Sequence, residues 1–412
     1  MRVLIVHQNF PGQFPHIADA LVARGDEVVA IGGPTSKERQ GIRLVRWKNI
    51  RGSAKDIFPP AVRAEADLIR AEVAALVAVE LRDAGFVPDV VIGHPGWGET
   101  IHMKAVFPDA PLILFGEFFY RHIGADVNFD REFETPTLKG AMYTTGKSAS
   151  QLLGYSMADL IISPTRFQAS TFPAILQPKI RVLHEGVDLS RARRNPDALF
   201  KLPDGSTLDA SSPVITFINR NFERLRGYHI FMRALPRFLD AVPDAQVILI
   251  GADGKGYGSS RKDGKTWREA MFNELGSRLD RKRLHFVGQV EHRHMINILS
   301  IGAAHVYYTY PFVLSWSLAE AMACECLVIG SDTAPVRDAI TDGKDGILLD
   351  FFDVDALSQA MIDAVRQPDR YRDMRRQARL TALELFDRES MGVPGWLAMI
   401  DELAERDRLP GA

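Results

Sequence analysis

The 412-residue sequence has only two cysteines, no long apolar run and no excess of charge of either sign. Cys324 and Cys326 are separated by one residue, too close for ordinary disulfide geometry, and two cysteines are too few for a structural zinc site. We expect both to be small core residues in a reducing compartment. The 50 Lys and Arg nearly balance the 52 Asp and Glu, which excludes the overall basic field of a general nucleic-acid binder.

No stretch is apolar over the length that spans a bilayer, and the opening segment, Met1 to His7, is typical of a strand. We therefore expect a cytoplasmic protein. There is also no periodic repeat and no low-complexity tract. The composition, with 46% apolar and 25% charged residues, is that of a globular protein long enough for two domains.

Short apolar runs alternate with helical patterns, and the series restarts at Val214 after a polar, turn-rich stretch. This alternation predicts an α/β fold with parallel sheets covered on both sides. Two such doubly wound domains would create a crevice at the carboxyl ends of their strands. We expect a first domain over 1–190, a linker over 191–212, a second domain over 213–390 and a C-terminal helix over 391–412 that packs back on the first domain.

Glu320 is the most informative single residue. It lies in an otherwise apolar predicted helix, Ser317 to Ala323, and a buried strand follows at residues 326–330. A carboxylate in such a place needs a ligand hydroxyl, a cation or backbone donors. Ser315 and Ser317 stand at the predicted helix start, where free amides suit an anion. The alternative is a capped core helix whose glutamate reaches solvent at its edge.

A cluster of arginines follows the first predicted strand of the second half, between Asn219 and Gly227. Arginine offers fixed, charged donors that match phosphate oxygens, and glycine permits close approach of the backbone. We expect Arg220 and Arg226 to bind a ligand and Arg224 to be a solvated surface residue.

Three segments together resemble the retaining family-4 glycosyltransferases: Arg220 with Arg226-Gly227, the run from Phe286 to Val290, and Ser317 to Ala323. The first half is similar mainly in architecture and in its Pro11-Gly12 loop. The resemblance implies a GT-B fold, in which two Rossmann-like domains face a central crevice. It also implies that a sugar moves from a nucleotide diphosphate sugar to an acceptor hydroxyl with retention, without a cofactor or a metal.

The resemblance implies a role for each matching residue. Arg220 and Arg226 would act in catalysis by stabilising the charge that grows on the departing diphosphate, with Arg226 where the family usually has lysine. Glu320 would hold the ribose hydroxyls of the nucleotide. The other implied donor-binding residues are Gly12, Val290, Leu314, Ser315, Trp316 and Ser317.

One part of the family pattern is missing. The Glu-x7-Glu motif would place a sugar-contacting glutamate eight residues before Glu320, where this sequence has Phe312. Two alternatives to a transferase therefore stay open: a non-catalytic nucleotide-sugar-binding protein, and a nucleotide-sugar epimerase on a GT-B scaffold.

Two loops of the first half follow predicted strands and would face the crevice. His94, Trp97 and Glu117 are the acceptor-side candidates in them, because many family members have a histidine close to the position of Glu117. The alternative for Glu117 is an ion pair with Arg121 on one helix turn.

Six cations and one acid lie between Lys37 and Arg51. This stretch would steer an anionic acceptor or make weak peripheral contact with a membrane, at its inner face. The alternative that we favour is a solvated strand edge, where charge discourages strand pairing. The expected partners are a nucleotide sugar and a glycan, lipid-linked or small-molecule acceptor, with no nucleic acid.

Overall fold

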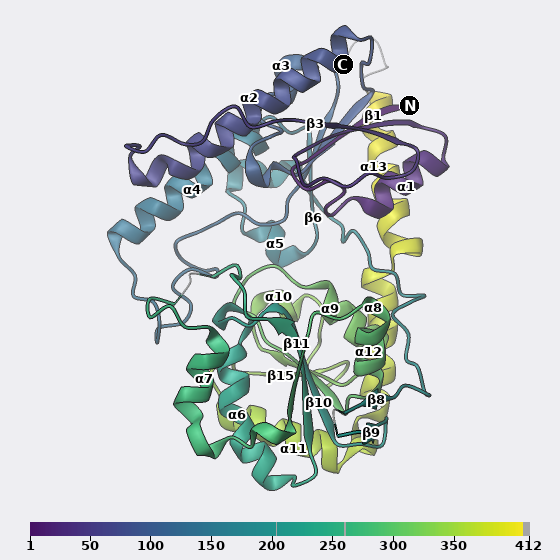
Figure 1. Ribbon diagram of the computed structural model, residues 1–412. Helices are drawn as coiled ribbons and strands as arrows, with labels where there is room; N and C mark the ends of the chain where they lie inside the picture. Colours follow the sequence, from purple (N-terminus) through teal and green to yellow (C-terminus); the bar gives the residue numbers. More distant parts are fainter. Residues whose placement is uncertain (203, 259–260, 407–412) are drawn as a thin grey trace. The chain divides into compact units, whose positions relative to one another are not determined.

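The computed structural model describes residues 1–202, 204–258 and 261–406, and the chain divides into two compact units. Unit 1 comprises Met1–Gly186 and the segment that begins at Arg388, and unit 2 comprises Val187–Asp387. Each unit contains one large parallel sheet with helices on both faces (Figure 1). The predicted α/β class with two Rossmann-like domains is confirmed.

The sheet of unit 1 has seven parallel strands in the order β3-β2-β1-β4-β5-β6-β7. The order reverses direction at β1, so the loops after β1 and β4 lie at the topological switch point, where open parallel sheets bind ligands. The strands are β1 (Arg2–His7), β2 (Glu27–Gly32), β3 (Ile42–Arg46), β4 (Val90–Gly93), β5 (Leu112–Phe115), β6 (Leu160–Ser163) and β7 (Ile180–Val182).

Alternate residues of β1 enter the two hydrophobic layers of unit 1. Val3 and Ile5 belong to the layer that contains α1 and α13, whereas Leu4 and Val6 belong to the layer that contains α2 and α4. This two-residue period explains why a strand buried on both faces is apolar throughout. The helices are α1 (Pro15–Ala23), α2 (Val62–Asp83), α3 (Met103–Val106), α4 (Leu138–Ser156), α5 (Arg166–Ser170) and α13 (Val393–Arg406), with 3-10 turns η1 (Pro59–Ala61), η2 (Pro95–Trp97) and η3 (Ala174–Lys179).

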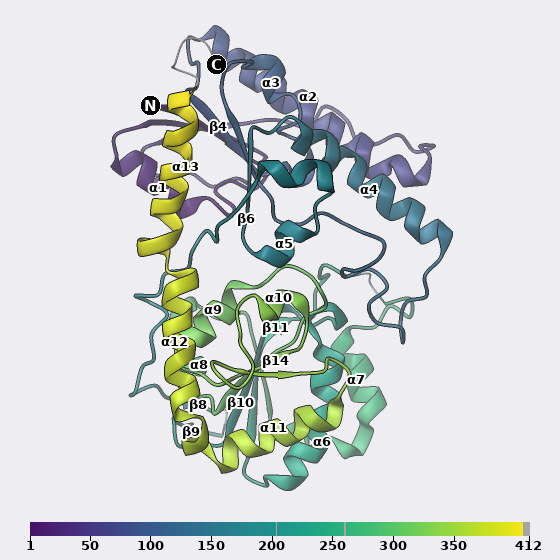
Figure 2. The ribbon, with the colours of Figure 1, turned by 180° about the vertical axis from the view of Figure 1, so that it is seen from behind.

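The C-terminal helix α13 is part of unit 1, where it lies beside α1 (Figure 2). Trp396 and Ile400 are fully buried in the same layer as Val3 and Ile5. Arg24 also pairs with Asp401 at 2.8 Å across this helix pair. A π-helical turn at Arg388–Gly392 leads into α13.

The sheet of unit 2 has six parallel strands in the order β12-β11-β10-β13-β14-β15, which reverses direction at β10. Its strands are β10 (Val214–Asn221), β11 (Gln246–Ala252), β12 (Leu284–Gly288), β13 (Ala304–Tyr307), β14 (Val328–Ser331) and β15 (Ile347–Leu349). Its helices are α6 (Tyr228–Ala241), α7 (Trp267–Leu275), α8 (His292–Ile301), α9 (Trp316–Ala323), α10 (Ala334–Arg337), α11 (Val354–Arg366) and α12 (Arg372–Phe386), with short turns η4 (Arg224–Arg226), η5 (Gly276–Arg278), η6 (Arg281–Arg283) and η7 (Pro368–Tyr371).

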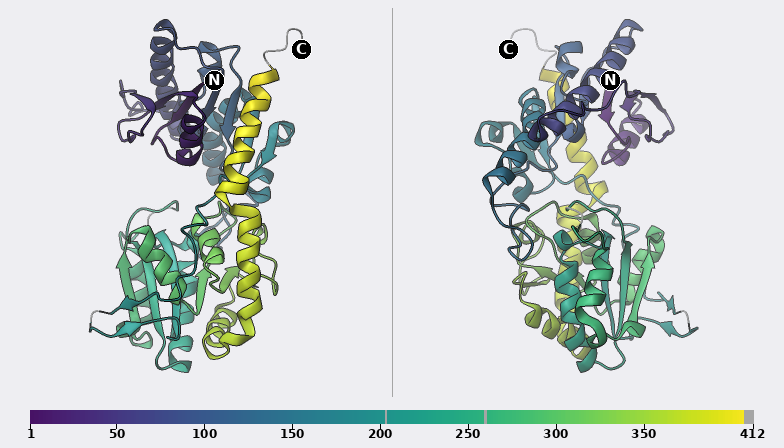
Figure 3. Two further views of the ribbon diagram at one scale, coloured as in Figure 1. Left: turned by 90° about the vertical axis from the view of Figure 1, so that its right-hand side faces the viewer. Right: turned by 60° about the vertical axis from the view of Figure 1, so that its left-hand side comes forward.

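Two helical layers enclose the unit 2 sheet (Figure 3). Helix α6 packs with α7 and α11, and α9 packs with α8 and α12. The stretch 191–212, expected as a linker, instead contains the small antiparallel pair β8 (Phe200–Lys201) and β9 (Thr207–Leu208). Its apolar side chains, including Ala192 and Leu202, lie in the core of unit 2, so the chain crosses between units at Gly186 and Val187 instead.

Two smaller expectations agree with the structure. Cys324 and Cys326 are buried free thiols. The basic stretch includes β3, an edge strand of the unit 1 sheet, and Arg46 pairs with Glu38 at 2.7 Å. Among the described residues, no helix combines the length and the apolar character that crossing a membrane requires.

Candidate functional site

In unit 1, polar side chains gather at the carboxyl ends of three adjacent strands. His7 ends β1, His94 directly follows β4, and Glu117 follows β5 after one intervening residue. His94 Nε2 lies 3.5 Å from Glu117 Oε2, and the Gln13 amide donates a hydrogen bond of 3.1 Å to Glu117 Oε1. Gln13 also contacts His7, with 2.7 Å between Gln13 Oε1 and His7 Nε2. These four side chains therefore form one continuous polar network.

The environment of this network sets the charges of its members. Burial, and next the neighbouring His94, lower the pKa of His7 to about 3, so His7 is neutral at physiological pH. Burial alone would raise the pKa of Glu117, but the neighbouring His94, the hydrogen bond from Gln13 and His7 together outweigh it and lower that pKa. The Glu117 side chain is 38% exposed, so its ionised carboxylate stays open to a ligand.

The geometry of the surrounding loops explains why position 12 is glycine and how Trp97 contacts the network. Gly12 has a φ of +53°, and a Cβ there would lie 2.1 Å from His7 Nε2, so only glycine fits. The Trp97 ring lies 4.8 Å from the His94 ring and 5.4 Å from the His7 ring, measured between centroids. The indole therefore restrains both imidazoles.

The structure brings together the three acceptor-side candidates of the sequence, His94, Trp97 and Glu117. The alternative ion pair between Glu117 and Arg121 is wrong, because Arg121 donates to main-chain oxygens at the end of α5, those of Ser170, Thr171 and Phe172. The sequence analysis missed His7 and Gln13. The position of His7 at the end of the first predicted strand was the signal that would have found it.

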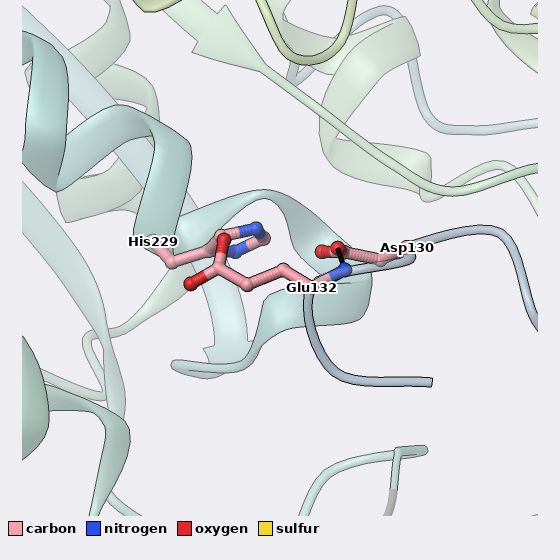
Figure 4. Close-up of side chains that lie close together, drawn as sticks. All are labelled: Asp130, Glu132 and His229. Carbon is pink, nitrogen blue, oxygen red and sulfur yellow. Dashed lines mark hydrogen bonds between the residues drawn. The ribbon is translucent and has the colours of Figure 1, made fainter. Parts of the chain in front are cut away.

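Asp130 and Glu132 are two of the acidic residues on the long loop between β5 and α4 of unit 1. Asp130 is buried, and its carboxylate accepts a hydrogen bond of 3.0 Å from the main-chain N–H of Glu132 (Figure 4). This contact closes a local turn. In unit 2, the buried His229 occupies the second position of α6 (Figure 4).

In unit 2, the loop between β13 and α9 carries most of the predicted donor residues. Ser315 caps α9: its hydroxyl accepts from the N–H of Ser317 at 3.3 Å, and its own N–H donates to the Tyr307 hydroxyl at 2.8 Å. Leu314 is partly buried, and Trp316 is 37% exposed. The main-chain amides at the helix start are thus held in a fixed arrangement at the end of a parallel strand.

Glu320 lies one turn into α9 and has a partner that the sequence analysis did not name. Its Oε1 is 2.6 Å from Nε2 of His292, the first residue of α8. The hydrogen bond and charge of Glu320 raise the pKa of His292 against the effect of partial burial. The Glu320 side chain is 12% exposed, so it reaches the surface at the edge of its helix. His292 follows the predicted donor-binding residue Val290 by two residues, and this position could have identified it from the sequence.

Arg226 is buried and fixed to the loop that precedes α9. Its Nη1 donates to Thr309 Oγ1 at 3.0 Å and to the main-chain oxygen of Val313 at 2.8 Å. The guanidinium carbon lies 5.5 Å from the centroid of the Phe312 ring, which is itself 5.3 Å from the ring of Tyr257. Phe312, where the family motif has glutamate, is therefore a buried stacking partner of Arg226.

The other two arginines of this loop differ from each other. Arg220 is exposed at the end of β10 and makes no hydrogen bond or ion pair with any described residue. Arg224, expected to be solvated, is instead buried in the turn η4. The turn ends at Gly227, which has a φ of +69° and approaches Tyr308 so closely that a Cβ would lie 2.3 Å from the Tyr308 Cβ. Because the chain approaches Tyr308 so closely at this point, Arg224 and Arg226 of η4 are buried in unit 2.

The loop after β12 contains Val290, the last of the predicted donor-binding residues. Gly288 ends β12 with a φ of +69°, and a Cβ there would meet open space. Val290 is partly buried and packs against the core of unit 2. Its side chain therefore supports the loop, which leaves the main chain near Gly288 accessible.

Comparisons with known proteins agree with this arrangement. Residues 24–192 match the glycosyl transferase family 4 group, and residues 201–381 match the glycosyl transferases group 1. A GDP-mannose-dependent alpha-(1-6)-phosphatidylinositol monomannoside mannosyltransferase of Mycolicibacterium smegmatis is 24% identical over 269 residues, 61% of this chain and 64% of that protein. An alpha-maltose-1-phosphate synthase of the same organism is 26% identical over 231 residues, 52% and 55%. The chain thus spans less than two thirds of either relative.

Solved structures match over nearly the whole chain. Sucrose-phosphate synthase from Thermosynechococcus elongatus has a TM-score of 0.69 at 15% identity, with 99% of this chain and 98% of that chain covered. HepE from Anabaena, in complex with UDP and glucose, has a TM-score of 0.67 at 14% identity, with 98% and 100% covered. At such identities these likenesses show the fold alone, which is GT-B. With both units matched by family, the chain belongs to the family-4 glycosyltransferases, with a second unit of the group 1 type.

Proposed function

We propose that the protein transfers a hexose from a nucleotide diphosphate sugar to an acceptor hydroxyl, with retention of the anomeric configuration and without a divalent metal. The main support is the loop before α9, where the buried Arg226 holds Val313 at 2.8 Å and the start of α9 presents capped amides. A fixed cation beside the positive end of a helix suits a diphosphate leaving group.

The proposed donor site uses charge that is already in place. Negative charge grows on the diphosphate as the glycosidic bond breaks, and Arg226, Arg220 and the positive end of α9 would stabilise it. Arg220 is exposed and uncommitted among the described residues, so it is free to follow the phosphate. Glu320 would accept hydrogen bonds from the ribose hydroxyls through its second oxygen, because Oε1 is already bound by His292.

The proposed acceptor site is the network of His94, Glu117, Gln13 and His7. An ionised, partly exposed Glu117 can accept a hydrogen bond from an acceptor hydroxyl and orient it. His7 is neutral and deeply buried, so its role is to fix Gln13. The acceptor would be a glycan, a lipid-linked molecule or a small molecule.

The names of the relatives support a hexose. One is a mannosyltransferase that depends on GDP-mannose, and another is an alpha-maltose-1-phosphate synthase. We extend to this chain only the sugar class, because the nucleotide differs among proteins that share this fold.

The first experiment is a thermal-shift screen with GDP-, UDP-, ADP- and TDP-hexoses. A ligand at a hundred times its dissociation constant adds about 2.7 kcal/mol to stability, which raises the melting temperature measurably. Glu320→Ala should abolish the shift, whereas Glu384→Gln, a change at an exposed position of α12, should not. If a donor raised the melting temperature of the wild type and of both variants equally, Glu320 would not be part of the donor site.

The second experiment identifies the chemistry. With the donor found, proton NMR of the product should show the anomeric configuration of the donor, and activity should persist after treatment with EDTA. An inverted product would refute retention, and loss of activity that Mg²⁺ or Mn²⁺ restores would refute metal independence. Donor binding without turnover across a wide acceptor panel would refute transferase activity.

A further inference from the structure

An open groove in unit 1 lies between α4, the loop after β5 and the end of α5. It has a volume of about 480 Å³, and its surface is mostly apolar. Its lining includes Phe119, Ile123, Thr145, Ala149, Leu152 and Pro173. This size and this chemistry are those of a small-molecule site rather than of a flat contact surface.

Four polar side chains of the groove, Arg121, Thr144, Ser148 and Thr171, are already engaged within the protein. Arg121 donates through Nε and Nη2 to main-chain oxygens of 170–172. The hydroxyls of Thr144, Ser148 and Thr171 donate to main-chain oxygens at 3.1, 2.9 and 2.6 Å. A ligand would therefore find few unsatisfied partners there, so the part of a ligand that enters should be a hydrocarbon.

One end of the groove connects through the main chain to the acceptor-side network. Phe119 follows Glu117 by two residues, and its N–H donates to Thr171 Oγ1 at 3.1 Å. The Gln168 amide donates to the main-chain oxygen of Glu117 at 2.6 Å. The same segment thus carries the Glu117 carboxylate and begins the apolar wall.

The other end opens on exposed apolar side chains. Ile123 is 69% exposed and Leu152 is 39% exposed, and two further apolar residues of α4, Leu138 and Met142, are also exposed. The nineteen residues of α4 include Lys139 and Lys147 and no acid. An exposed apolar face without acidic residues suits an amphiphile, because neither its chain nor an anionic head group would be repelled.

We propose that this groove binds the hydrocarbon chain of an amphiphilic acceptor whose hydroxyl is held by Glu117. The inference rests on the proposed function for its link to transfer. The affinity of the groove for a hydrocarbon does not depend on that function.

The test measures binding of hexyl, octyl and decyl β-D-glucoside, each below its micelle concentration, by calorimetry without donor. Each added methylene should lower Kd about fourfold while the chain remains inside the groove. Ala149→Trp fills the groove and should weaken decyl glucoside binding at least tenfold and remove the chain-length dependence. Ser156→Trp places the same indole at the exposed end of α4, outside the groove, and should change Kd less than twofold.

A second pair of variants, Thr145→Glu and Ser156→Glu, covers the case in which Ala149→Trp does not fold. Thr145→Glu should weaken decyl glucoside binding at least tenfold, and Ser156→Glu should not. Decanoate, which has the chain without the sugar, should compete with decyl glucoside. Absence of competition would overturn the assignment of the groove to the chain.

Three further outcomes would overturn the inference: a Kd that does not vary with chain length, equal effects of the two tryptophan variants, or a concentration-dependent dimer that Ala149→Trp dissociates. The last would assign the groove to a second copy of the chain. If chain-length-dependent binding is found but no nucleotide sugar supports transfer, the proposed function fails and the groove assignment stands.

Discussion

The Nη1 atom of Arg226 donates hydrogen bonds to both the Thr309 hydroxyl and the main-chain oxygen of Val313, at 3.0 and 2.8 Å. One guanidinium thus holds the loop that leads into α9 while it remains available as a charge. Lysine, usual at this place in the family that the sequence resembles, is a point charge on a side chain one atom shorter, so it cannot place a donor where Nη1 lies and keep a second nitrogen for a ligand.

Arg226→Lys should therefore lower kcat/KM for the donor on the order of a hundredfold, because the charge remains but the loop loses its anchor. Steady-state kinetics measure this change. Arg237→Lys is a matched control, since Arg237 lies half-exposed on α6. If Arg226→Lys matched the wild type, the two hydrogen bonds would have no part in donor binding.

Phe312→Glu tests the altered motif. The resemblance puts position 312 against the transferred sugar, where a carboxylate would accept a hydroxyl hydrogen bond that phenylalanine cannot. The variant should prefer a donor with that hydroxyl over its deoxy analogue at least tenfold more than the wild type does. Competition assays measure the ratio, with Phe312→Leu as the apolar control. If the ratio were equal in all three proteins, Phe312 would have no part in sugar recognition.

Glu117→Gln tests the acceptor site. Loss of the charge that His94 stabilises should raise KM for the acceptor about tenfold or more and leave donor affinity unchanged, because the site lies in unit 1. Glu80→Gln, at an exposed position of α2, is the control. A change in donor affinity with unchanged acceptor KM would contradict the assignment.

Glu99 predicts a pH dependence of stability. It is fully buried, no described residue makes a hydrogen bond to its carboxylate, and burial raises its pKa to about 7. A raised folded-state pKa means that the folded form is favoured while Glu99 is protonated. The free energy of unfolding is therefore highest below the unfolded-state pKa near 4.5. It falls by roughly 3 kcal/mol as the pH rises to 7.

Glu99→Gln removes this titration. The melting temperature of the variant relative to wild type should therefore rise between pH 5 and pH 8, as measured by thermal denaturation. Glu80→Gln should show no such trend. A constant difference between Glu99→Gln and wild type at both pH values would mean that Glu99 is ionised at pH 5 as well.

The sequence predicted the strands well because parallel strands buried on both faces are continuous apolar runs, as in residues 3–6 and 247–250. It predicted His94 and Glu117 because each follows such a strand. It missed the contact between Glu320 and His292, since side chains on two helices meet only after the sheet is built. Arg224 was misjudged because its burial depends on the turn at Gly227 and its close approach to Tyr308.

The placement of α13 in unit 1 has a consequence for synthesis on the ribosome. Trp396 fills the core beside Val3 and Ile5, yet it emerges only after all of unit 2. Unit 2 is contiguous, so it can complete its core first, although domains generally fold in order from the N-terminus. A nascent chain stopped before residue 388 would leave the α1 face of unit 1 uncovered, and a fragment of residues 1–186 would carry the same exposed apolar surface.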